Sequence, residues 1–277
     1  MGKPDSSGEF PDLLADQVGR WEKLADWWHQ ETGDADELHR ELVIPSTKRL
    51  LELRPGEKVL DIGCGNGAFA REMAGLGAHV TAFDASETLI RIARKRSAGE
   101  ADRIAWHVID AASEEPLLAL GEGNLDAAVA KMVLMDMAMI VPLLNAVGKL
   151  LKPGGRFVFS ILHPAFNSTG SSLLTEEGVD AAGNPIVERS IKVFRYAEPE
   201  AGLGFAKFDQ PQAQYYFHRP LSNLLGSCFR AGLVMDALEE PVFTPEQQRK
   251  LKVLWREMPA IPPVLIARLR RPLPPAP

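Results

Sequence analysis

The spacing of apolar residues changes along the chain and separates a helical first part from an alternating second part. Near the start, apolar residues recur at helical spacing, at Leu14, Val18, Trp21, Ala25 and Trp28. A second helical stretch runs from about residue 35 to residue 53, and the turn RPGEK follows it. From Val59 onward, short apolar runs alternate with helical stretches. Such alternation is typical of a parallel sheet with helices on both faces.

Five apolar runs in the alternating part predict the first strands of that sheet. They are Lys58 to Ile62, His79 to Phe83, Ile104 to Ile109, Leu125 to Ala130 and Arg156 to Leu162. Helices are predicted between them, over Ala68 to Ala74, Ser86 to Ser97 and Val141 to Leu151. Ser86 is the expected N-cap of the second of these helices. The glycines of LKPGGRF predict a tight turn into the fifth strand.

The pattern weakens from Pro164 onward, where glycine, serine, glutamate and proline become frequent. Only Ile191 to Tyr196 reads as a strand before the aromatic run YYFHRP. We interpret residues 164–217 as an insertion that covers a functional site, because long connections in compact domains are usually functional or disordered. The alternation then resumes with a helix, a strand, a helix and a last strand, over Leu221 to Ala231, Leu233 to Leu238, Pro245 to Trp255 and Val264 to Leu269.

Composition narrows the class of protein. The chain has 277 residues, of which 45% are hydrophobic and 25% charged, so it can bury a large core. A net charge of −6 argues against a nucleic-acid or membrane-surface partner. Cys64 and Cys228 form no disulfide framework, and we expect a reducing, cytoplasmic location. The six histidines lie apart, so no metal site is predicted, and polar residues interrupt the most apolar stretch, so no membrane span is predicted either.

The stretch KVLDIGCGNGAFA, residues 58–70, is the most informative motif. A strand that opens through Gly63, Gly65 and Gly67 into a helix can bring bare backbone close to a nucleotide-like ligand. The motif alone does not identify that ligand. Gly63, Gly65 and Ala68, with Asp84 further on, also satisfy the dinucleotide pattern of NAD-dependent enzymes.

Acidic residues at the ends of three strands favour a different nucleotide. Asp61 ends the first strand beside the glycine turn, where a carboxylate would repel a pyrophosphate and attract an ammonium group. Asp84 ends the second strand, where it can accept the two hydroxyls of a ribose. Asp110 ends the third strand, where it can accept a hydrogen bond from an adenine amine. An ammonium, a ribose diol and an adenine amine together describe S-adenosylmethionine, bound at the carboxyl ends of adjacent strands.

Five stretches of the chain resemble a known family. VLDIGCGNGAFA, VTAFDAS, HVIDAA, LDAAVAKMVLMDM and LLKPGGRFVFS occur in the order and spacing of the class I S-adenosylmethionine-dependent methyltransferases, of the type that methylates small molecules. The resemblance implies a Rossmann-like, doubly wound α/β fold with a mostly parallel, seven-stranded sheet and an antiparallel last strand. Residues 1–53 would form an N-terminal helical cap, and residues 54–277 the methyltransferase domain with its insertion after the fifth strand.

The resemblance assigns one group of residues to the methionine part of S-adenosylmethionine. Asp61 and the backbone of Gly63 and Gly65 would meet that part of the cofactor. Ala130 and Lys131, which end the fourth strand, would lie near the methionine ammonium and the sulfonium. Lys131 departs from the small or polar residue that the family often has there. For Asp61, a bridge to loop backbone amides is the structural alternative.

A second group of residues is assigned to the adenosine part. Asp84 would take the ribose hydroxyls, with Ala85 beside the adenine. Asp110 and Ala111 would contact the adenine edge. Trp28 continues the apolar stripe of the first helix, which predicts a core position, but the cap of such enzymes often covers the cofactor, so Trp28 is also a candidate contact. Capping of the following turn or helix is the alternative for both Asp84 and Asp110.

Methyl transfer from a sulfonium needs no nucleophilic side chain, but a general base assists when the acceptor is a phenol, an alcohol or a protonated amine. His163, after the fifth strand, and His218, in YYFHRP, are the candidate bases and substrate contacts. Residue types alternate in YYFHRP, and we expect Tyr216 and His218 to face the substrate. Asp136 lies either near the mouth of the site or in a solvated or capping position.

The sequence therefore predicts an enzyme that transfers a methyl group from S-adenosylmethionine to oxygen or nitrogen of a small molecule, of the secondary-metabolite type, with S-adenosylhomocysteine as the second product. Three alternatives remain: an NAD-dependent oxidoreductase, a non-catalytic module that binds S-adenosylmethionine, and a methyltransferase that acts on tRNA or protein. Neither the acceptor nor the oligomeric state follows from the sequence.

Overall fold

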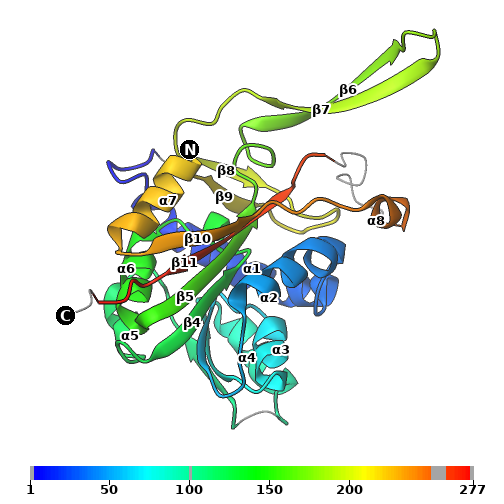
Figure 1. Cartoon of the computed structure of the whole chain (residues 1–277). Coiled ribbons are helices and arrows are strands. Elements are labelled where there is room, and N and C mark those ends of the chain that lie inside the picture. Colours follow the sequence, from blue (N-terminus) through cyan, green and yellow to red (C-terminus); the bar gives the residue numbers. More distant parts are fainter. Residues whose placement is uncertain (1–2, 100–101, 251–259, 275–277) are drawn as a thin grey trace.

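A seven-stranded sheet forms the centre of the computed structural model, which describes residues 3–99, 102–250 and 260–274 (Figure 1). The strand order is β10-β11-β5-β4-β1-β2-β3. The strands are β1 (Lys58–Ile62), β2 (His79–Asp84), β3 (Ile104–Val108), β4 (Leu125–Lys131), β5 (Leu151–Leu162), β10 (Val234–Glu239) and β11 (Val264–Arg270). Strands β1 to β5 pair in parallel, and β11 runs antiparallel between β5 and β10. The predicted fold class, including the antiparallel last strand, is confirmed.

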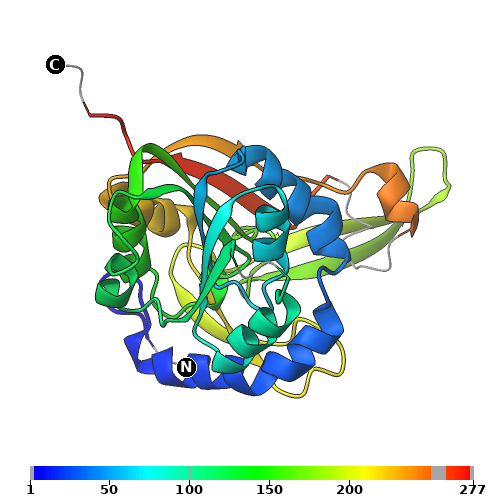
Figure 2. The same ribbon diagram turned by 90° about the horizontal axis from the view of Figure 1, so that it is seen from below.

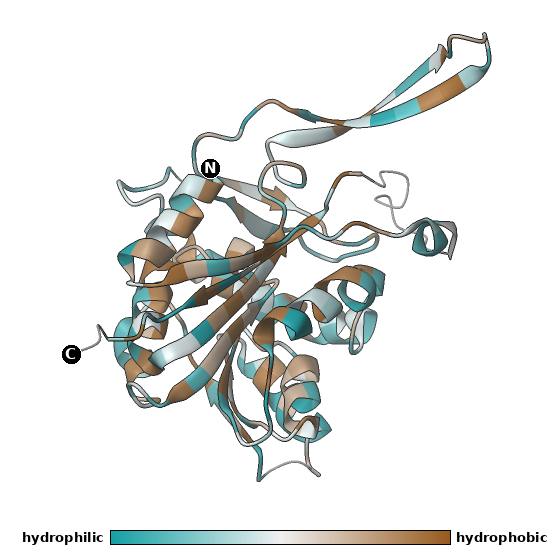
Figure 3. Ribbon diagram, viewed as in Figure 1, coloured by the Kyte–Doolittle hydropathy of each residue, from teal (hydrophilic) through white to brown (hydrophobic). Residues whose placement is uncertain are grey.

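Helices cover both faces of the sheet. The helices along the alternating part are α3 (Ala68–Gly75), α4 (Glu87–Arg96), α5 (Glu114–Leu118), α6 (Val141–Leu150) and α7 (Leu221–Arg230). Figure 1 shows α5, α6 and α7 on one face, and α3 and α4 on the other. The central strands are apolar because both of their faces are covered, as the brown colour of the sheet in Figure 3 shows. Two apolar cores result, one on each face.

The alternation of side chains along each strand decides which residues reach the core and which reach the glycine turn. Ile62 of β1 and Ala130 of β4 are paired neighbours, and both pack into the core beside α6. Asp61 lies one residue before Ile62 and therefore points to the opposite face, and Lys131 lies one residue after Ala130 and does the same. The fold thus places an acid and a base on one face.

Several element boundaries differ from the prediction. β5 begins at Leu151 rather than at Arg156, because Leu151 already pairs with Leu125 of β4. The register then shifts over the turn residues, and pairing resumes at Arg156. The predicted strand over residues 191–196 is the end of a longer strand that stops at Val193. Helix α8 (Pro245–Lys250) begins as predicted, and the rest of its predicted length, to residue 255, lies outside the described residues. Ser86 is confirmed as an N-cap, since its hydroxyl accepts a hydrogen bond of 3.1 Å from Leu89 N–H.

The residues before β1 form a short 3-10 helix (Pro11–Leu13), α1 (Leu14–Thr32), a π-helical turn (His39–Val43) and α2 (Ile44–Leu51). The π-helical turn and α2 pack into the core beside α3, so this part of the predicted cap is also a layer on the sheet. α1 instead crosses the molecule and packs against α4 and the insertion, as Figure 2 shows. Tyr215 Oη donates to Asp16 at 2.9 Å, and Arg20 donates to the Ala213 carbonyl at 3.0 Å.

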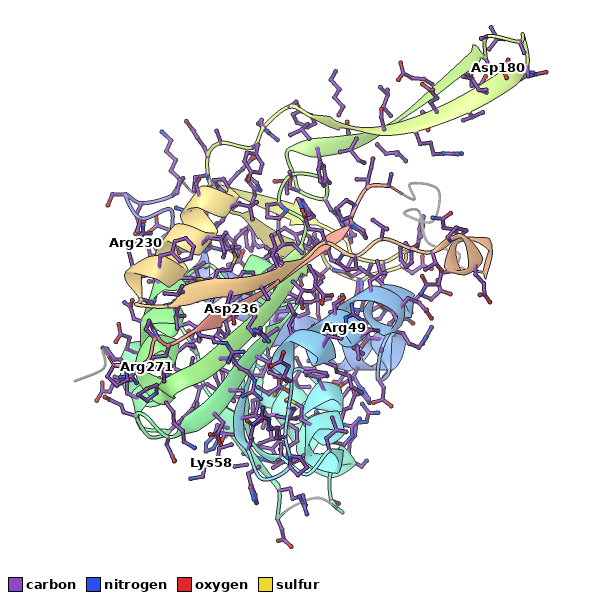
Figure 4. The ribbon with its side chains drawn as sticks, in the orientation of Figure 1. Arg49, Lys58, Asp180, Arg230, Asp236 and Arg271 are labelled. Atoms are coloured by element: carbon purple, nitrogen blue, oxygen red, sulfur yellow. The ribbon has the colours of Figure 1, made fainter. Side chains whose placement is uncertain are left out.

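The insertion consists of two hairpins with different surroundings. Strands β6 (Ser171–Val179) and β7 (Pro185–Val193) form an arm that extends away from the body, with Asp180 at its tip (Figures 1 and 4). Strands β8 (Glu200–Gly204) and β9 (Gln214–His218) form the second hairpin, which packs on the body. Within the described ranges, no helix has the length and apolarity that a membrane crossing requires. The proposed division at residue 53 remains a prediction.

Candidate active site

Two cavities lie at the carboxyl ends of the central parallel strands. The smaller has a volume of about 170 Å³ and is lined by the glycine turn, by the ends of β1, β2 and β4, and by one side of helix α1. The larger has a volume of about 870 Å³ and is lined by the cap, the exit of β5 and the insertion. Trp28, His39, Met132 and Asp136 line both cavities. The cavities therefore adjoin each other.

The smaller cavity brings together nearly all of the residues predicted to contact a cofactor. Its lining includes Asp61, Gly63, Gly65, Asp84, Ala85, Asp110, Ala111, Lys131 and Trp28. Ala130 is the exception: its side chain is fully buried in the core on the other face, as the alternation along β4 requires. The structure thus collects residues that are up to 103 positions apart, from Trp28 to Lys131, around one space.

Asp61 is the most unusual group in the smaller cavity. Its carboxyl group is 2% exposed, and its Oδ2 has no hydrogen-bond partner. Burial raises the pKa of Asp61 to about 7, although the nearby charge of Lys131 opposes the shift. Burial in turn lowers the pKa of Lys131. A bridge from Asp61 to loop amides is not seen, and an unsatisfied buried carboxyl oxygen fits a cationic ligand group.

The three glycines of the turn serve different purposes. Gly63 has a φ of +60°, and a Cβ there would lie 2.3 Å from Val133 Cγ2. Gly67 has a φ of +76°, and its Cβ would lie 2.4 Å from Trp106 Cη2. Only Gly65, with a φ of +56°, faces open space. Gly63 and Gly67 thus also make room for protein side chains, and the approach of a ligand to the backbone of the turn remains a prediction.

Asp84 and Asp110 both bind local backbone, as the capping alternative expected. Asp84 accepts hydrogen bonds of 2.9 Å from Gly65 N–H and from Ser86 N–H, which fastens the glycine turn to the end of β2. Burial raises the pKa of Asp84. Asp110 is exposed and accepts a bond of 3.0 Å from Ala112 N–H. Each carboxylate still has lone pairs for a ligand, so the two roles are compatible.

The larger cavity is mostly apolar with a few polar groups. Its apolar lining comes from distant parts of the chain and includes Leu38, Met135, Ile161, Phe205, Leu224 and Phe243. Tyr216, predicted to face the substrate, lines it together with His218. Phe217 also borders this cavity, and its ring packs on Phe10, with ring centroids 5.2 Å apart. A wide apolar space with few polar groups is typical of a small-molecule site.

The two predicted base candidates lie in different surroundings. His163 lines neither cavity, and both of its ring nitrogens are engaged: Nδ1 accepts from Ala165 N–H at 3.2 Å, and Nε2 donates to Glu240 at 2.7 Å. Its placement does not support the expected catalytic role, because no nitrogen remains for a substrate. His218 donates Nε2–H to the Tyr196 carbonyl at 2.8 Å, which leaves Nδ1 as an acceptor.

Asp136 is more deeply buried than its position in the sequence indicated. It is 7% exposed rather than solvated, and it lines both cavities. Its Oδ1 has no hydrogen-bond partner, and burial raises its pKa well above the ordinary value. The only signal in the sequence was an acid inside the apolar run VLMDM.

Sequence reasoning missed the pair formed by Asp36 and His39. The ring Nδ1–H of His39 donates to Asp36 Oδ1 at 2.7 Å, and the His39 backbone N–H donates to the same oxygen at 3.0 Å. Burial, together with the charge of Lys131, lowers the pKa of His39, so the ring is neutral near pH 7. The pKa of Asp36 is lowered, since the hydrogen bonds of His39 outweigh its burial. His39 is the first residue of a π-helical turn, and π-helical turns are frequent at functional sites.

The described residues contain no group of three or more histidine, cysteine, aspartate or glutamate side chains placed to hold a metal ion.

Comparison with known proteins agrees with this geometry. Residues 60–159 match the Methyltransferase domain family. A protein named ubiquinone biosynthesis O-methyltransferase, from Xanthomonas axonopodis pv. citri, is 32% identical over 148 residues, which are 53% of this chain and 61% of that protein. The homonymous protein of Xanthomonas euvesicatoria pv. vesicatoria is 33% identical over 151 residues. The chain thus spans about 61% of the length of these relatives.

Solved structures extend the likeness beyond that region. An S-adenosylmethionine-dependent methyltransferase from Mesorhizobium loti has a TM-score of 0.63 and 26% identity, and the match covers 82% of this chain and 96% of that one. A 1,6-didemethyltoxoflavin-N1-methyltransferase from Burkholderia thailandensis shares the fold, with a TM-score of 0.54 and 18% identity over 94% of this chain and 87% of its own.

The predicted motifs lie in the matched domain, the sheet has the expected topology, and the strand ends surround one cavity. Residues 60–159 thus match a methyltransferase domain, and the fold around them is similar to that of the S-adenosylmethionine-dependent methyltransferase of Mesorhizobium loti.

Proposed function

We propose that this chain transfers a methyl group from S-adenosylmethionine to an oxygen or nitrogen atom of a small, largely apolar molecule. The observation that carries the proposal is the common wall of the two cavities, formed by Trp28, His39, Met132 and Asp136. A cofactor beside the glycine turn and an acceptor in the larger cavity would meet at this wall. Transfer requires such contact, because the acceptor lone pair must be held in line with the methyl group.

The charges of the smaller cavity match the ends of the cofactor. Asp61, with its unsatisfied Oδ2, would bind the methionine ammonium. Lys131, on the same face, would pair with the methionine carboxylate, so that the buried Asp61 and the half-buried Lys131 each meet a group of opposite charge. Gly63 and Gly65 would contribute backbone next to this part.

The other end of the smaller cavity would hold the nucleoside. Asp84 would accept the ribose hydroxyls with the lone pairs that Gly65 and Ser86 leave free. Asp110 and Ala111 would contact the adenine edge, with Ala85 beside the ring.

The protein's remaining tasks are to exclude water, orient the acceptor and remove its proton, since the bound cofactor itself supplies the electrophilic methyl group on a sulfonium. We assign proton removal to His39. Its Nδ1–H is held by Asp36, so Nε2 carries the lone pair, and the ring lines both cavities. The proton of the acceptor O–H or N–H would pass to Nε2 as the acceptor atom bonds to carbon and the carbon–sulfur bond breaks. His218 and Tyr216, which line only the larger cavity, would contact the acceptor.

Two proteins of known name support a small-molecule acceptor without deciding the atom. A relative is named for O-methylation in ubiquinone biosynthesis, and a protein of the same fold is named for N1-methylation of 1,6-didemethyltoxoflavin. The large apolar lining of the second cavity agrees with a molecule of this kind, which includes secondary metabolites.

The test is transfer of a labelled methyl group. The protein is incubated with S-adenosylmethionine carrying a ¹³CD₃ group and a small-molecule extract of its host cells, and products are identified by mass. A product heavier by the label, absent with the Asp84→Ala variant, supports the proposal. Saturable cofactor binding without any labelled product would favour the non-catalytic module, and binding of NADH in place of S-adenosylmethionine would favour the oxidoreductase.

A further inference from the structure

The β8–β9 hairpin presents an unusual polar face to the larger cavity. Its register places Gly202 opposite Tyr216 and Gly204 opposite Gln214. A Cβ at Gly204 would lie 3.1 Å from Cε2 of the Tyr216 ring, so the ring lies against bare backbone. β8 therefore adds no side chain beside the ring, and Gln214, Tyr216 and His218 form the lining from this hairpin face.

A chain of hydrogen bonds leads to the Tyr216 hydroxyl, and its first member has only one orientation. The backbone N–H of Ala206 donates to Gln210 Oε1 at 2.9 Å, and Gln210 Nε2 donates to the Gln212 carbonyl at 2.6 Å. A backbone N–H can only donate and a carbonyl can only accept. The Gln210 amide is therefore fixed, with its nitrogen on the side of Gln214.

The fixed orientation of the Gln210 amide determines which way the remaining hydrogen bonds to Tyr216 run. Gln210 Nε2 donates to Gln214 Oε1 at 2.8 Å, so the other end of the Gln214 amide is its nitrogen, which donates to Tyr216 Oη at 3.0 Å. Gln210 and Gln214 are 6% and 2% exposed, so water does not compete for these bonds. Tyr216 Oη is thus an acceptor within the protein, and its own proton points elsewhere.

No described residue accepts that proton. Burial and the charge of Asp136 raise the pKa of Tyr216, so its hydroxyl stays protonated. The ring lines the larger cavity, where the Asp136 carboxyl also has an oxygen without a partner. An apolar ligand would strip water from the hydroxyl and leave a buried donor unsatisfied, whereas a ligand with an oxygen acceptor would satisfy it.

We infer that Tyr216 donates its hydroxyl proton to a carbonyl or ether oxygen of the methyl acceptor, and that Gln210 and Gln214 are positioning residues that aim it. The inference rests on the proposed function only in that the ligand of the larger cavity is the methyl acceptor. It defines the acceptor class: an apolar, ring-containing molecule that carries, besides the atom to be methylated, an oxygen able to accept a hydrogen bond.

Two probe molecules of nearly equal shape test this assignment by binding alone. 2-Acetyl-6-hydroxynaphthalene carries a carbonyl oxygen, and 2-isopropyl-6-hydroxynaphthalene replaces it by a methyl group. Both are titrated against the full chain saturated with S-adenosylhomocysteine. We expect the acetyl probe to bind about tenfold more tightly to the unchanged protein, and Tyr216→Phe to abolish the preference. The stretching frequency of a ¹³C-labelled carbonyl should be lower when bound to the unchanged protein than to Tyr216→Phe.

A matched pair of variants tests the positioning role. Gln214→Met keeps the length of the side chain but removes the bond to Tyr216, so the preference for the acetyl probe should fall by about two- to threefold. Gln212→Met is the control, because only the backbone carbonyl of Gln212 takes part in the chain of bonds, and the preference should stay unchanged.

An equal affinity of both probes for the unchanged protein, failure of both to bind, or a preference that survives Tyr216→Phe would overturn the inference. Binding of S-adenosylhomocysteine, measured first for each variant, shows that the protein is folded. Failure of that binding in the unchanged protein would contradict the proposed function instead, so the two failures are distinct.

Discussion

The two cavities differ in the charge of the side chains that line them. In the smaller cavity, Asp61 and Lys131 are held on one face with little solvent, and Asp61 keeps an oxygen without a partner. In the larger cavity, most of the wall is apolar, Tyr216 and His218 are hydrogen-bonded, and the charge of Lys207 lies 3.7 Å from that of Asp36. Burying unpaired charge destabilises a fold unless a ligand compensates it. The first cavity therefore suits a ligand with charged groups, and the second suits a largely apolar molecule that makes a few polar contacts.

The cavities also differ in construction. The smaller one is made by the ends of paired strands, whose positions are fixed by the sheet, together with one side of α1. The larger one is closed mainly by loops and by the β8–β9 hairpin, which is held to α1 by contacts such as that of Tyr215 with Asp16. Rigid strand ends suit a constant ligand, and surface connections can vary with the acceptor.

The largest effect is expected where the two cavities meet. His39→Gln should slow methyl transfer by about 10²- to 10⁴-fold, because the acceptor proton loses its base. Cofactor affinity should change little. Asp36→Asn is the matched variant: it should slow transfer less and should change the ring tautomer of His39, which ¹⁵N NMR reports. Full activity of His39→Gln, or a proton on Nε2 in the unchanged protein at pH 7, would exclude the assignment.

A smaller effect is expected inside the first cavity. Asp84→Ala should weaken S-adenosylmethionine binding by about 100-fold, since it removes charged hydrogen bonds to the ribose and releases the Gly65 amide. Asp110→Ala should weaken it by only about threefold, because Asp110 is exposed. Calorimetric titration measures both. An unchanged affinity in Asp84→Ala would show that the ribose role is wrong.

A pH dependence separates the two cavities further. The pKa of Asp61 is raised to about 7, so its carboxylate is present above that pH and is protonated below it. A bound ammonium requires the carboxylate, and S-adenosylmethionine affinity should fall by about tenfold between pH 8 and pH 6. Asp61→Asn should bind weakly at both pH values and lose the dependence. Binding of the naphthalene probes should not change over this range, and a parallel change would contradict the separation.

The smallest effect is expected in the arm formed by β6 and β7. It belongs to the same insertion as the β8–β9 hairpin but lines neither cavity. Replacing residues 172–192 by a short glycine-serine turn should leave both cofactor affinity and probe affinity within about twofold. Titrations with S-adenosylhomocysteine and the acetyl probe measure this. A large loss of either affinity would show that the arm supports the site.

The sheet and the first cavity could be predicted because their signals are local. A strand places every second residue on one face, so Asp61, next to the end of β1, and Asp84, at the end of β2, are marked by position alone. The same alternation places Ala130 and Lys131 on opposite faces of β4, so it would have excluded Ala130 as a cofactor contact. The fifth strand was cut short because its pairing with β4 continues through a stretch of turn residues.

The second cavity could not be predicted in the same way, because its residues are placed by contacts between distant segments. His163 follows a central strand, yet its ring turns to Glu240, which is 77 residues away. His39 looked like an ordinary helical residue, and only the packing of the cap on the sheet brings it to the common wall. Asp36, three residues before it, was a weak signal of a fixed imidazole.

The common wall also has a consequence for the kinetics of turnover. Trp28 and His39 belong to the segment before the sheet and line both cavities, so a movement of this segment that admits one ligand disturbs the seat of the other. Binding of either ligand would then change the affinity for the other, and S-adenosylhomocysteine would inhibit competitively against S-adenosylmethionine, because both would occupy the smaller cavity.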